Sequence, residues 1–465
     1  MTVLLMLSAG CAAVLPAPAW AAGPPVGATA PGLLWGLPFA AVLLAIAFGP
    51  MLAPRFWHRR MGLIATVVSL ALLLPLAALR GPEVAWHGVW HATLAEYLPF
   101  ISLLLALFTV GGGILVAGGR IGTPAGNTAL LALGTVLAGV MGTTGVAMVL
   151  IHPLLRGNAH RTRKVHLVVF FIVLVANVGG ATTPLGDPPL YLGFLNGVPF
   201  FWPLRNLTIP LLVVALPLLG GFWLLDRSLA RGEPKPPPPR PLRVRGRRNA
   251  VLVVLVVATV LLQGVWHPGE VVLLGQPIGL ERLLGMAVFA AITLASVVIT
   301  PHALRRRNLF SWEPMREVAV LFAAIFVTIG PVLEMLDAGQ AGPLAPLLAL
   351  TSDAAGQPLP FAYFWLAGLL SGFLDNAPTY LVFFNLAGGD PAALTGQLAP
   401  VLRALSSGAV FFGALTYVGN APNMMVRTIA AQRGVRMPGF FAYILYASAL
   451  LMPLFGLLTL LHTRP

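Results

Sequence analysis

The chain has 465 residues, of which 58% are hydrophobic and only 9% are charged. A soluble domain carries about 25% charged residues, so this composition excludes a soluble enzyme or binding module and predicts an all-α polytopic membrane protein. The net charge of +14 does not indicate a nucleic-acid partner, because the basic residues fall in a few short loops between apolar segments, where they set membrane topology.

The first 22 residues form a segment of their own. Residues 3–15 are a short apolar run, and Pro16, Pro18 and the small-residue triplet Ala19-Trp20-Ala21 follow it. This order is typical of a secretory signal peptide and its cleavage site. The alternative is a retained N-terminal apolar segment, which the lack of a basic residue before the run leaves open.

Ten segments beyond residue 30 predict membrane crossings, since a spanning helix needs about 20 apolar residues. They lie near 31–53, 61–79, 94–116, 165–200, 207–226, 250–266, 281–300, 313–336, 401–432 and 439–461. The fourth and the ninth are longer than one crossing requires. Two further segments, 127–155 and 361–389, are each long enough for two half-crossings with a polar tip between them. We expect both to form re-entrant helical hairpins.

The basic residues predict the orientation of the chain in the membrane. Clusters at 55–60, 156–164, 227–248, 305–307 and 433–436 fall on one side of the membrane if residue 30 is outside. By the positive-inside rule this side is cytoplasmic, and we expect a multi-pass protein of the inner (plasma) membrane. A Pro- and Arg-rich linker at 227–249 then separates two halves, 31–226 and 250–461. Its composition predicts an extended spacer held near anionic lipid headgroups.

A polar, proline-broken decapeptide occurs twice. Gly180-Ala-Thr-Thr-Pro-Leu-Gly-Asp-Pro-Pro189 lies in the fourth predicted crossing, and Gly413-Ala-Leu-Thr-Tyr-Val-Gly-Asn-Ala-Pro422 lies in the ninth. One constant offset aligns these segments and also the two hairpin tips, Gly142-Thr-Thr-Gly145 and Asp375-Asn-Ala-Pro-Thr379. Each half thus contains a hairpin, a broken helix and a closing helix. The charge count puts the two hairpins on opposite sides of the membrane, as inverted repeats.

The breaks and tips predict the binding site. In lipid, a broken helix is tolerated only where it lines a cavity or is buried in protein, because its unpaired backbone groups must be satisfied internally. Paired breaks in corresponding positions of two halves point to the binding site of a secondary transporter. The sequence shows no catalytic residues, no cofactor motif and no soluble-enzyme signature such as a Walker loop. We therefore expect a transporter and not an enzyme.

Two carboxylates are the strongest candidates for the chemistry. An ionisable side chain in the bilayer interior costs at least ~2.5–3.5 kcal/mol, and Asp187 lies in the first break while Asp375 lies at the second tip. Neither residue has a Lys or Arg near it in the sequence, so a bound cation or a proton is the simplest neutralising partner. Alternatively, a carboxylate caps a half-helix, a role that suits Asp375 better than Asp187.

Neutral polar residues complete the predicted ion-binding set: Thr143, Thr144, Asn177, Thr182, Thr183, Asn376, Thr379, Thr416, Asn420 and Asn423. Hydroxyl and amide oxygens suit a hard cation such as Na⁺. Its expected ligands are Asp187, Asp375, Asn376 and Asn420. Half-helix N-termini at the hairpin tips could equally hold an anion. The residues alone therefore predict an ion site without deciding the sign of the ion.

Three segments resemble the ion transporter superfamily: Asn177-Val-Gly-Gly-Ala-Thr-Thr-Pro-Leu-Gly-Asp-Pro-Pro189, Leu374-Asp-Asn-Ala-Pro-Thr379 and Tyr417-Val-Gly-Asn-Ala-Pro-Asn423. That group includes NhaD-type sodium/proton antiporters, arsenite carriers, citrate-metal transporters and dicarboxylate/sodium symporters. The chain is most similar to its citrate transport or sodium:proton antiporter branch, over residues 31–461. The resemblance implies a homodimer in which the hairpins and broken helices form a transport domain that moves against a scaffold.

The hairpin tips depart from one branch of that superfamily. Its symporters carry Ser-Asn-Thr at both tips, whereas this chain has Gly-Thr-Thr-Gly and Asp-Asn-Ala-Pro-Thr. An added carboxylate would repel a di- or tricarboxylate and favour a cation or a proton. Sodium/proton antiport is therefore the first hypothesis, with Asp187 as the group for which the two ions compete. A citrate-type organic anion or oxyanion carrier coupled to cations is the alternative.

Overall fold

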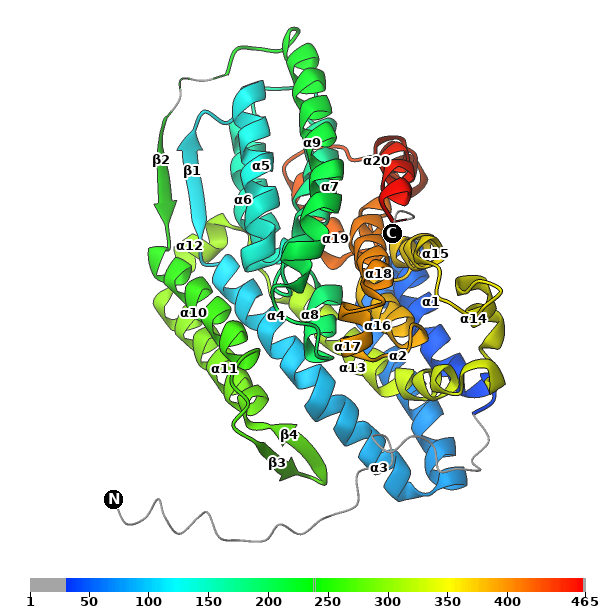
Figure 1. The fold of residues 1–465 in the computed structure, drawn as a ribbon. Helices are drawn as coiled ribbons and strands as arrows, with labels where there is room; N and C mark the ends of the chain where they lie inside the picture. Colours follow the sequence, from blue (N-terminus) through cyan, green and yellow to red (C-terminus); the bar gives the residue numbers. More distant parts are fainter. Residues whose placement is uncertain (1–30, 237, 239, 463–465) are drawn as a thin grey trace.

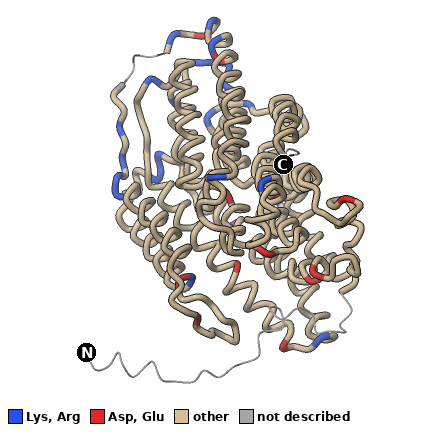
Figure 2. The backbone as a smooth tube through the Cα atoms, viewed as in Figure 1, with Lys and Arg blue, Asp and Glu red and all other residues tan. Residues whose placement is uncertain are grey.

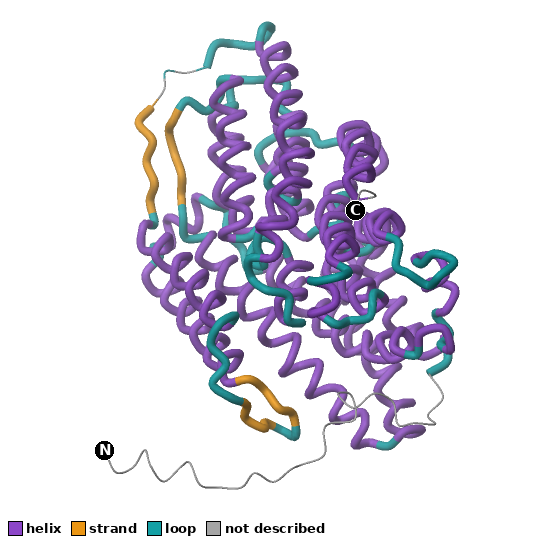
Figure 3. The backbone as a smooth tube through the Cα atoms, in the orientation of Figure 1, coloured by secondary structure: helices purple, strands orange, loops and turns teal. Residues whose placement is uncertain are grey.

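Helices dominate the described part of the chain. The structure, a computed structural model, describes residues 31–236, 238 and 240–462, so the predicted signal peptide at residues 1–22 lies outside it. Apart from two small two-stranded sheets, the regular elements are helical (Figure 1, Figure 3). Within the described residues, nine helices are long and apolar enough to cross a membrane. The prediction of an all-α polytopic membrane protein is confirmed.

The long helices follow the predicted order, except that α5 was predicted as a half-crossing in the hairpin at 127–155 and is long and apolar enough for a full crossing. They are α1 (Leu37–Leu52, after the 3-10 turn Leu33–Gly36), α2 (Pro54–Arg80), the run from α3 (Pro82–His91) to α4 (Leu98–Gly111), α5 (Pro124–Met141), α7 (Val165–Leu174) with the 3-10 turn Val178–Thr182, α9 (Trp202–Ala230), α11 (Leu280–Ile299), α13 (Glu313–Asp337) and α20 (Phe440–His462). Helix α10 (Arg247–Gln263), predicted to cross at 250–266, has only 17 residues. It falls just short of the ~20 residues of a full crossing.

A π-helical turn (Ala92–Tyr97) joins α3 to α4. Pro99 has no N–H, so it frees the carbonyl of Ala95, which would receive that bond in an α-helix. The Arg282 guanidinium, at the start of α11, donates to this carbonyl over 3.2 Å and to the carbonyl of Leu195 over 2.8 Å. A side chain from the other half of the chain therefore supplies the hydrogen bond that this carbonyl of the irregular turn lacks.

Both predicted hairpins are present as pairs of helices. In the first, α5 passes into α6 (Thr143–Gly157) at Gly142, whose φ of +78° favours glycine. In the second, α15 (Pro360–Phe373) is followed by α16 (Asn376–Leu386) after two residues, Leu374 and Asp375. Each tip thus begins a helix whose first N–H groups have no partner within that helix.

Both overlong predicted crossings are broken helices. The first consists of α7, the 3-10 turn and α8 (Pro188–Leu195), and the second of α18 (Ala399–Phe412), the 3-10 turn Gly413–Leu415 and α19 (Ala421–Gln432). Each resumes with a proline in its first turn, where the missing N–H costs no helical hydrogen bond. Asp187 and Asn420 are the residues just before the two restarts.

Matching hydrogen bonds connect each break to the hairpin of its own half. The Thr183 hydroxyl donates to the Gly139 carbonyl, and the Thr416 hydroxyl donates to the Gly372 carbonyl. Each hydroxyl also accepts a bond from the backbone N–H two residues later. The duplicated sequence therefore folds into duplicated local structure.

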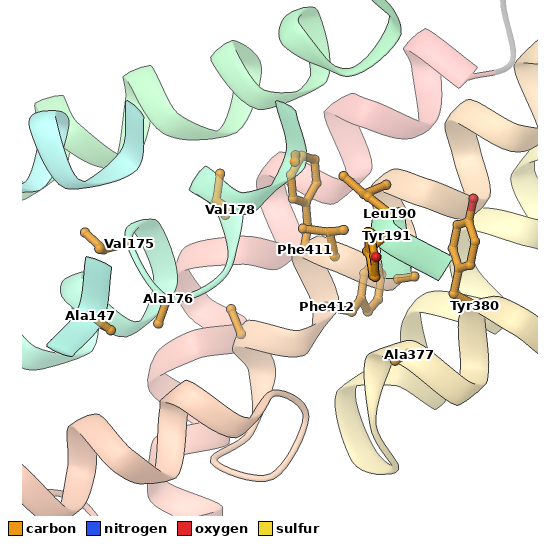
Figure 4. Packing of buried hydrophobic residues seen from close by; sticks show 14 of the residues in the cluster. Ala147, Val175, Ala176, Val178, Leu190, Tyr191, Ala377, Tyr380, Phe411 and Phe412 are labelled. Carbon is orange, nitrogen blue, oxygen red and sulfur yellow. The ribbon is translucent and has the colours of Figure 1, made fainter. Parts of the chain in front are cut away.

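Large buried side chains pack around the breaks (Figure 4). Tyr191 and Tyr380 are each only 1% exposed. Phe412 stacks on Phe455 of α20 with ring centroids 4.2 Å apart, and Tyr417 stacks on Tyr443 at 4.1 Å. The polar groups of the breaks are thus surrounded by apolar surface, where they must find partners inside the protein.

The linker differs from its prediction as a simple extended spacer. Residues Arg240–Arg245 form strand β2, which pairs antiparallel with β1 (Leu115–Gly119). Helix α4 stops at Gly111, short of the predicted residue 116, because a run of three glycines begins there and weakens the helix. The residues after it are then free to pair as a strand. Pairing between two segments so far apart has no local sequence signal, which is why the sequence did not predict it.

Short elements complete the fold: the hairpin of β3 (Glu270–Leu273) and β4 (Gln276–Gly279), α12 (His302–Arg307), the 3-10 turn Gly339–Ala341, α14 (Ala345–Thr351) and α17 (Pro391–Thr395). Figure 2 shows that many Lys and Arg residues gather toward the end of the molecule where α5, α6 and α9 project. This is the distribution expected of a cytoplasmic end.

Candidate functional site

A small cavity lies where the two breaks and the two hairpin tips meet. Its volume is about 60 Å³. The polar side is formed by Thr143, Thr144, Asp187, Asp375, Asn376 and Asn420, and the apolar side mainly by residues of α4 and α13. A space of this size holds roughly four to six water molecules. It is far smaller than the ~300–1,000 Å³ of pockets that bind organic ligands.

Asp187 is the centre of the polar side and is only 2% exposed. Its Oδ1 accepts from the Thr143 hydroxyl at 3.1 Å and from the Asn420 amide at 2.9 Å, and its Oδ2 accepts from the Asn376 amide. Thr143 and Asn376 belong to the two hairpin tips, whereas Asn420 belongs to the second break. One carboxylate therefore joins elements from both halves of the chain.

The Asn420 amide is fixed in one orientation. Besides its bond to Asp187, its Nδ2 donates to the Ala176 carbonyl and to Oδ1 of Asn177, each over 3.2 Å. Asn177 in turn donates to Oδ1 of Asn423 at 2.7 Å. A chain of amides thus runs between the two breaks and points an N–H at Asp187.

The Asn376 amide is held by fewer bonds. It is 1% exposed, and its Nδ2 donates to Asp187. Its Oδ1 has no hydrogen-bond partner within the described part of the chain. A buried acceptor without a partner costs about 1–3 kcal/mol. Because Asn376 is also one of the residues that line the cavity, this unpaired acceptor lies in the wall of the site.

Asp375 both lines the cavity and caps a helix. Its side chain accepts from the N–H of Ala377, in the first turn of α16, over 3.2 Å. This is the capping role that the sequence left open for Asp375. Asp187 occupies the corresponding position before α8 but makes no side-chain cap bond. Its oxygens are directed to the tips and the second break instead.

Six of the predicted residues stand behind the residues that line the cavity: Asn177, Thr182, Thr183, Thr379, Thr416 and Asn423. The Thr379 hydroxyl donates to the Asp375 carbonyl over 2.7 Å. The Asn423 amide donates to the carbonyls of Gly413 and Thr416 over 2.7 and 2.9 Å. Side chains of this group satisfy backbone groups that the breaks leave without helical partners. They position the site rather than face its cavity.

The cavity is negatively charged in character. Among the described residues that line it are two carboxylates and no Lys, Arg or His. Arg427 of α19 lies over the ring of Tyr417, 4.6 Å from its centroid, and does not line the cavity. Two unit charges 5 Å apart interact by ~3 kcal/mol at an effective dielectric constant of about 20. Where these carboxyl groups are ionised, a cation is attracted to this cavity and an anion is repelled.

The apolar wall was not predicted. Leu103, Leu107 and Phe108 come from α4, and Met315 and Phe322 come from α13. The stretches that begin at residues 105 and 323 resemble each other in the two halves of the sequence. That similarity is the signal that could have identified them as a pair of elements at the site.

A second buried polar cluster, also missed, lies away from the cavity. Asp226 of α9 forms an ion pair with Arg161, accepts from the Asn127 amide at 2.9 Å and lies 2.9 Å from Nε2 of His166. These residues fasten α5, α7 and α9 to the loop after α6. In the sequence, Asp226 lies next to Arg227 at a predicted helix end. This is the usual context of a solvent-exposed ion pair, so the sequence did not predict that Asp226 is buried.

Comparison with known proteins agrees with this architecture. A family model described as "Putative citrate transport" matches residues 28–463. Relatives include an uncharacterized transporter of Mycobacterium bovis, 27% identical over 287 residues, and one of Mycobacterium tuberculosis, 27% identical over 284 residues. Each match covers 56% of this chain and 59% of the relative, so it spans about six tenths of the relative's length. The chain belongs to the Putative citrate transport family.

Proposed function

We propose that the protein is a sodium/proton antiporter of the inner membrane, in which Na⁺ and protons compete for the cavity at Asp187. The proposal rests on the acidic lining and the small size of the cavity. Two carboxylates and no basic side chain line a space of about 60 Å³ in the described structure. Carboxylate, amide and hydroxyl oxygens are the ligands that hard cations prefer.

Ligands for Na⁺ are available on three elements. Asp187 and Asp375 supply carboxylate oxygens, and Thr144 supplies a hydroxyl in the cavity lining. Bound Na⁺ neutralises the buried charge of Asp187, and so does a proton. Because a buried carboxylate without a counter-charge is costly, one of the two occupants is always favoured, and each excludes the other.

Exchange also requires the site to open to each side of the membrane in turn. The predicted topology places the breaks near the bilayer midplane, and the matching hydrogen bonds of Thr183 and Thr416 fit a pair of inverted repeats. We extend the proposal to a homodimer in which the hairpins and broken helices move together against α4 and α13. The apolar wall from α4 and α13 would then be the surface along which the polar side slides.

A citrate-type organic anion or oxyanion carrier coupled to cations is the second candidate, favoured by the family to which the chain belongs. In that case Asp187 and Asp375 hold coupling cations, and the N-termini of α6 and α16 receive the carboxylates. A cavity of about 60 Å³ must widen several-fold to admit such a substrate. The present geometry therefore favours the small ion.

Purified protein in liposomes separates the two candidates. A Na⁺ gradient should drive proton movement, recorded with an internal pH dye, when no organic anion is present. Na⁺-dependent uptake of labelled citrate without Na⁺-driven proton flux would replace antiport by the second candidate. The Asp187→Asn protein is the matched control, because the amide is nearly isosteric and lacks only the titratable charge.

A further inference from the structure

Arg282 joins two parts of the protein that must move against each other in the proposed exchange. Its guanidinium donates to the Leu195 carbonyl over 2.8 Å and to the Ala95 carbonyl over 3.2 Å. Leu195 is the last residue of α8, the second half of the first broken helix. Ala95 lies in the π-helical turn that leads into α4. One side chain therefore connects the proposed moving part to the proposed fixed part.

Arg282 itself belongs to the fixed part. It lies in the first turn of α11, and Ser296, near the other end of α11, donates to the Thr109 carbonyl of α4 over 3.2 Å. Helix α11 begins at the β3–β4 hairpin, away from the end of the molecule where the basic residues gather (Figure 1, Figure 2). By the predicted orientation this is the external end. The bond to Leu195 thus fastens the outer end of α8 to α11.

We propose that Arg282 is an external latch, whose bond to Leu195 holds α8 in place and keeps the ion site closed to the outside. Opening to the outside breaks this bond but not the bond to Ala95, because Arg282 and Ala95 belong to the same part. The inference rests on the alternate opening in the proposed function, and not on which ion is carried. It gives Arg282 a positioning role in transport.

Tyr191, one turn before Leu195 on α8, closes the same route at the level of the ion site. It lines the small cavity and is 1% exposed. Its ring stacks on Phe100 of α4 with centroids 6.3 Å apart, and its hydroxyl is directed to the Pro99 carbonyl at 3.4 Å. Helix α8 thus contacts the start of α4 at the cavity, and Arg282 fastens it further out. It must leave both contacts before an ion passes to the outside.

A second cavity, of about 400 Å³, reaches the latch from the outer side. Arg282 and Ala95 line it, together with the exposed residues His267 and Glu270, which precede α11. A cavity of this size and polarity holds water. Water can therefore take the place of the Leu195 carbonyl at the guanidinium when α8 moves away, which lowers the cost of breaking the bond.

The latch has a positive charge and no counter-charge. Arg282 forms no ion pair with another residue in the described part of the chain. The Leu195 carbonyl is among the last four of α8, which have no partner within the helix, and a cation is favourable at a helix C-terminus. Breaking this bond leaves no buried carboxylate unpaired. The contact is therefore suited to forming and breaking in every transport cycle.

Sided labelling of a cysteine in the cavity lining tests the latch. Leu185 lines the cavity and is 3% exposed, so Leu185→Cys should react with an impermeant methanethiosulfonate reagent only when the site opens. All variants also carry Cys11→Ser, which removes the one cysteine of the chain. In right-side-out vesicles Arg282→Gln should label about 10-fold faster than its parent, a factor that corresponds to ~1.4 kcal/mol. In inside-out vesicles its rate should not rise.

Arg80→Gln is the matched control. Arg80 donates to Glu334 over 2.7 Å and joins α2 to α13, neither of which belongs to the proposed moving part, so labelling should be unchanged from either side. Arg282→Lys should label from outside at an intermediate rate, because an ammonium keeps the charge but lacks the planar fork of the guanidinium. It decides the question if Arg282→Gln does not fold. An unchanged external rate would overturn the latch, and so would an equal rise from both sides, which indicates general loosening.

The labelling result is separable from the proposed antiport. It is recorded without Na⁺ and without a proton gradient, so it reports only on the opening of the site. Absence of Na⁺-driven proton flux in wild-type liposomes would overturn antiport and leave the latch in place. An external labelling rate that does not respond to Arg282 would overturn the latch even where wild type exchanges Na⁺ for protons.

Discussion

The two broken helices have similar backbone structure and differ in the residue just before the helix resumes. Asp187 and Asn420 both precede the restart of a helix, and Thr183 and Thr416 make equivalent bonds to the hairpins. The first break nevertheless carries a carboxylate, and the second carries an amide that donates to that carboxylate. The two breaks thus have similar architecture, but only the first contains a carboxylate. The second copy has become a hydrogen-bond partner of the first.

Removing the carboxylate of the first break should have the largest effect. Asp187→Asn should reduce Na⁺-driven proton flux in liposomes by at least about 100-fold, because the group that exchanges a proton for a cation is gone. The fold should persist, since the amide removes no apolar contact and relieves a buried charge. Thermal unfolding checks the second expectation. Exchange that continues with an unaltered pH profile would assign the coupling to another residue, with Asp375→Asn as the next variant to measure.

Placing an Asp in both breaks should have the second largest effect, a loss of stability. Asn420→Asp would place a second carboxylate about 2.9 Å from Asp187, at the present hydrogen-bond distance. Two like charges that close repel by ~5 kcal/mol at an effective dielectric constant of about 20. The folded protein then binds a proton more tightly than the unfolded chain, so its stability should fall as the pH rises.

Melting temperatures at pH 6 and pH 9 measure this effect. Asn420→Asp should melt lower at pH 9 than at pH 6, relative to wild type. Asn420→Ala is the control: it removes the hydrogen bond to Asp187 but adds no charge, so its additional loss of stability at pH 9 should be smaller than that of Asn420→Asp. Equal behaviour of the two variants would show that positions 187 and 420 are not electrostatically coupled.

Thr183→Ala and Thr416→Ala test the symmetric part of the comparison. Each removes a hydroxyl that bridges a break to its hairpin, at an expected cost of about 1 kcal/mol of unfolding free energy. The two losses should agree within a few tenths of a kcal/mol in denaturant titrations. A large effect of one and none of the other would mean that the breaks are alike in sequence but unlike in mechanical role.

The smallest expected effect lies at the linker. Glu233 accepts bonds from the hydroxyl and the N–H of Thr162 and from the N–H of Arg163, which lower the pKa of Glu233 to about 2. A lowered carboxyl pKa stabilises the folded state above the ordinary value near 4.5, and this contribution is lost as the pH falls toward 2.

Hydrogen exchange of the Thr162 and Arg163 amides tests this contact. In Glu233→Gln these amides should exchange slightly faster than in wild type at pH 7. The difference should shrink as the pH is lowered from about 5 to about 3, because the wild-type contact weakens there. A difference that is independent of pH would show that the charge of Glu233 does not contribute.

The sequence predicted the hairpins and the breaks because their signals are local. Glycine, proline and polar residues stand out inside apolar segments, and a constant offset relates the two copies. It could not separate Thr143, which lines the cavity, from Thr183, which supports it. Which hydroxyl faces the cavity depends on how the halves pack, and single-residue patterns do not contain that information. The sequence did not predict the hydrogen bond from Arg282 to the Ala95 carbonyl, for the same reason.

The β1–β2 pair has a consequence for how the first hairpin is attached. Strand β1 leads from α4 toward α5, and β2 leads from α9 back to α10. Everything between them, from the first hairpin to α9, is an insertion whose entry and exit lie side by side (Figure 1). Gly118 and Gly246, both with positive φ, lie in β1 and just after β2. The covalent connections of this insertion to the rest of the chain therefore lie at one place, and the strand pairing fastens its entry to its exit.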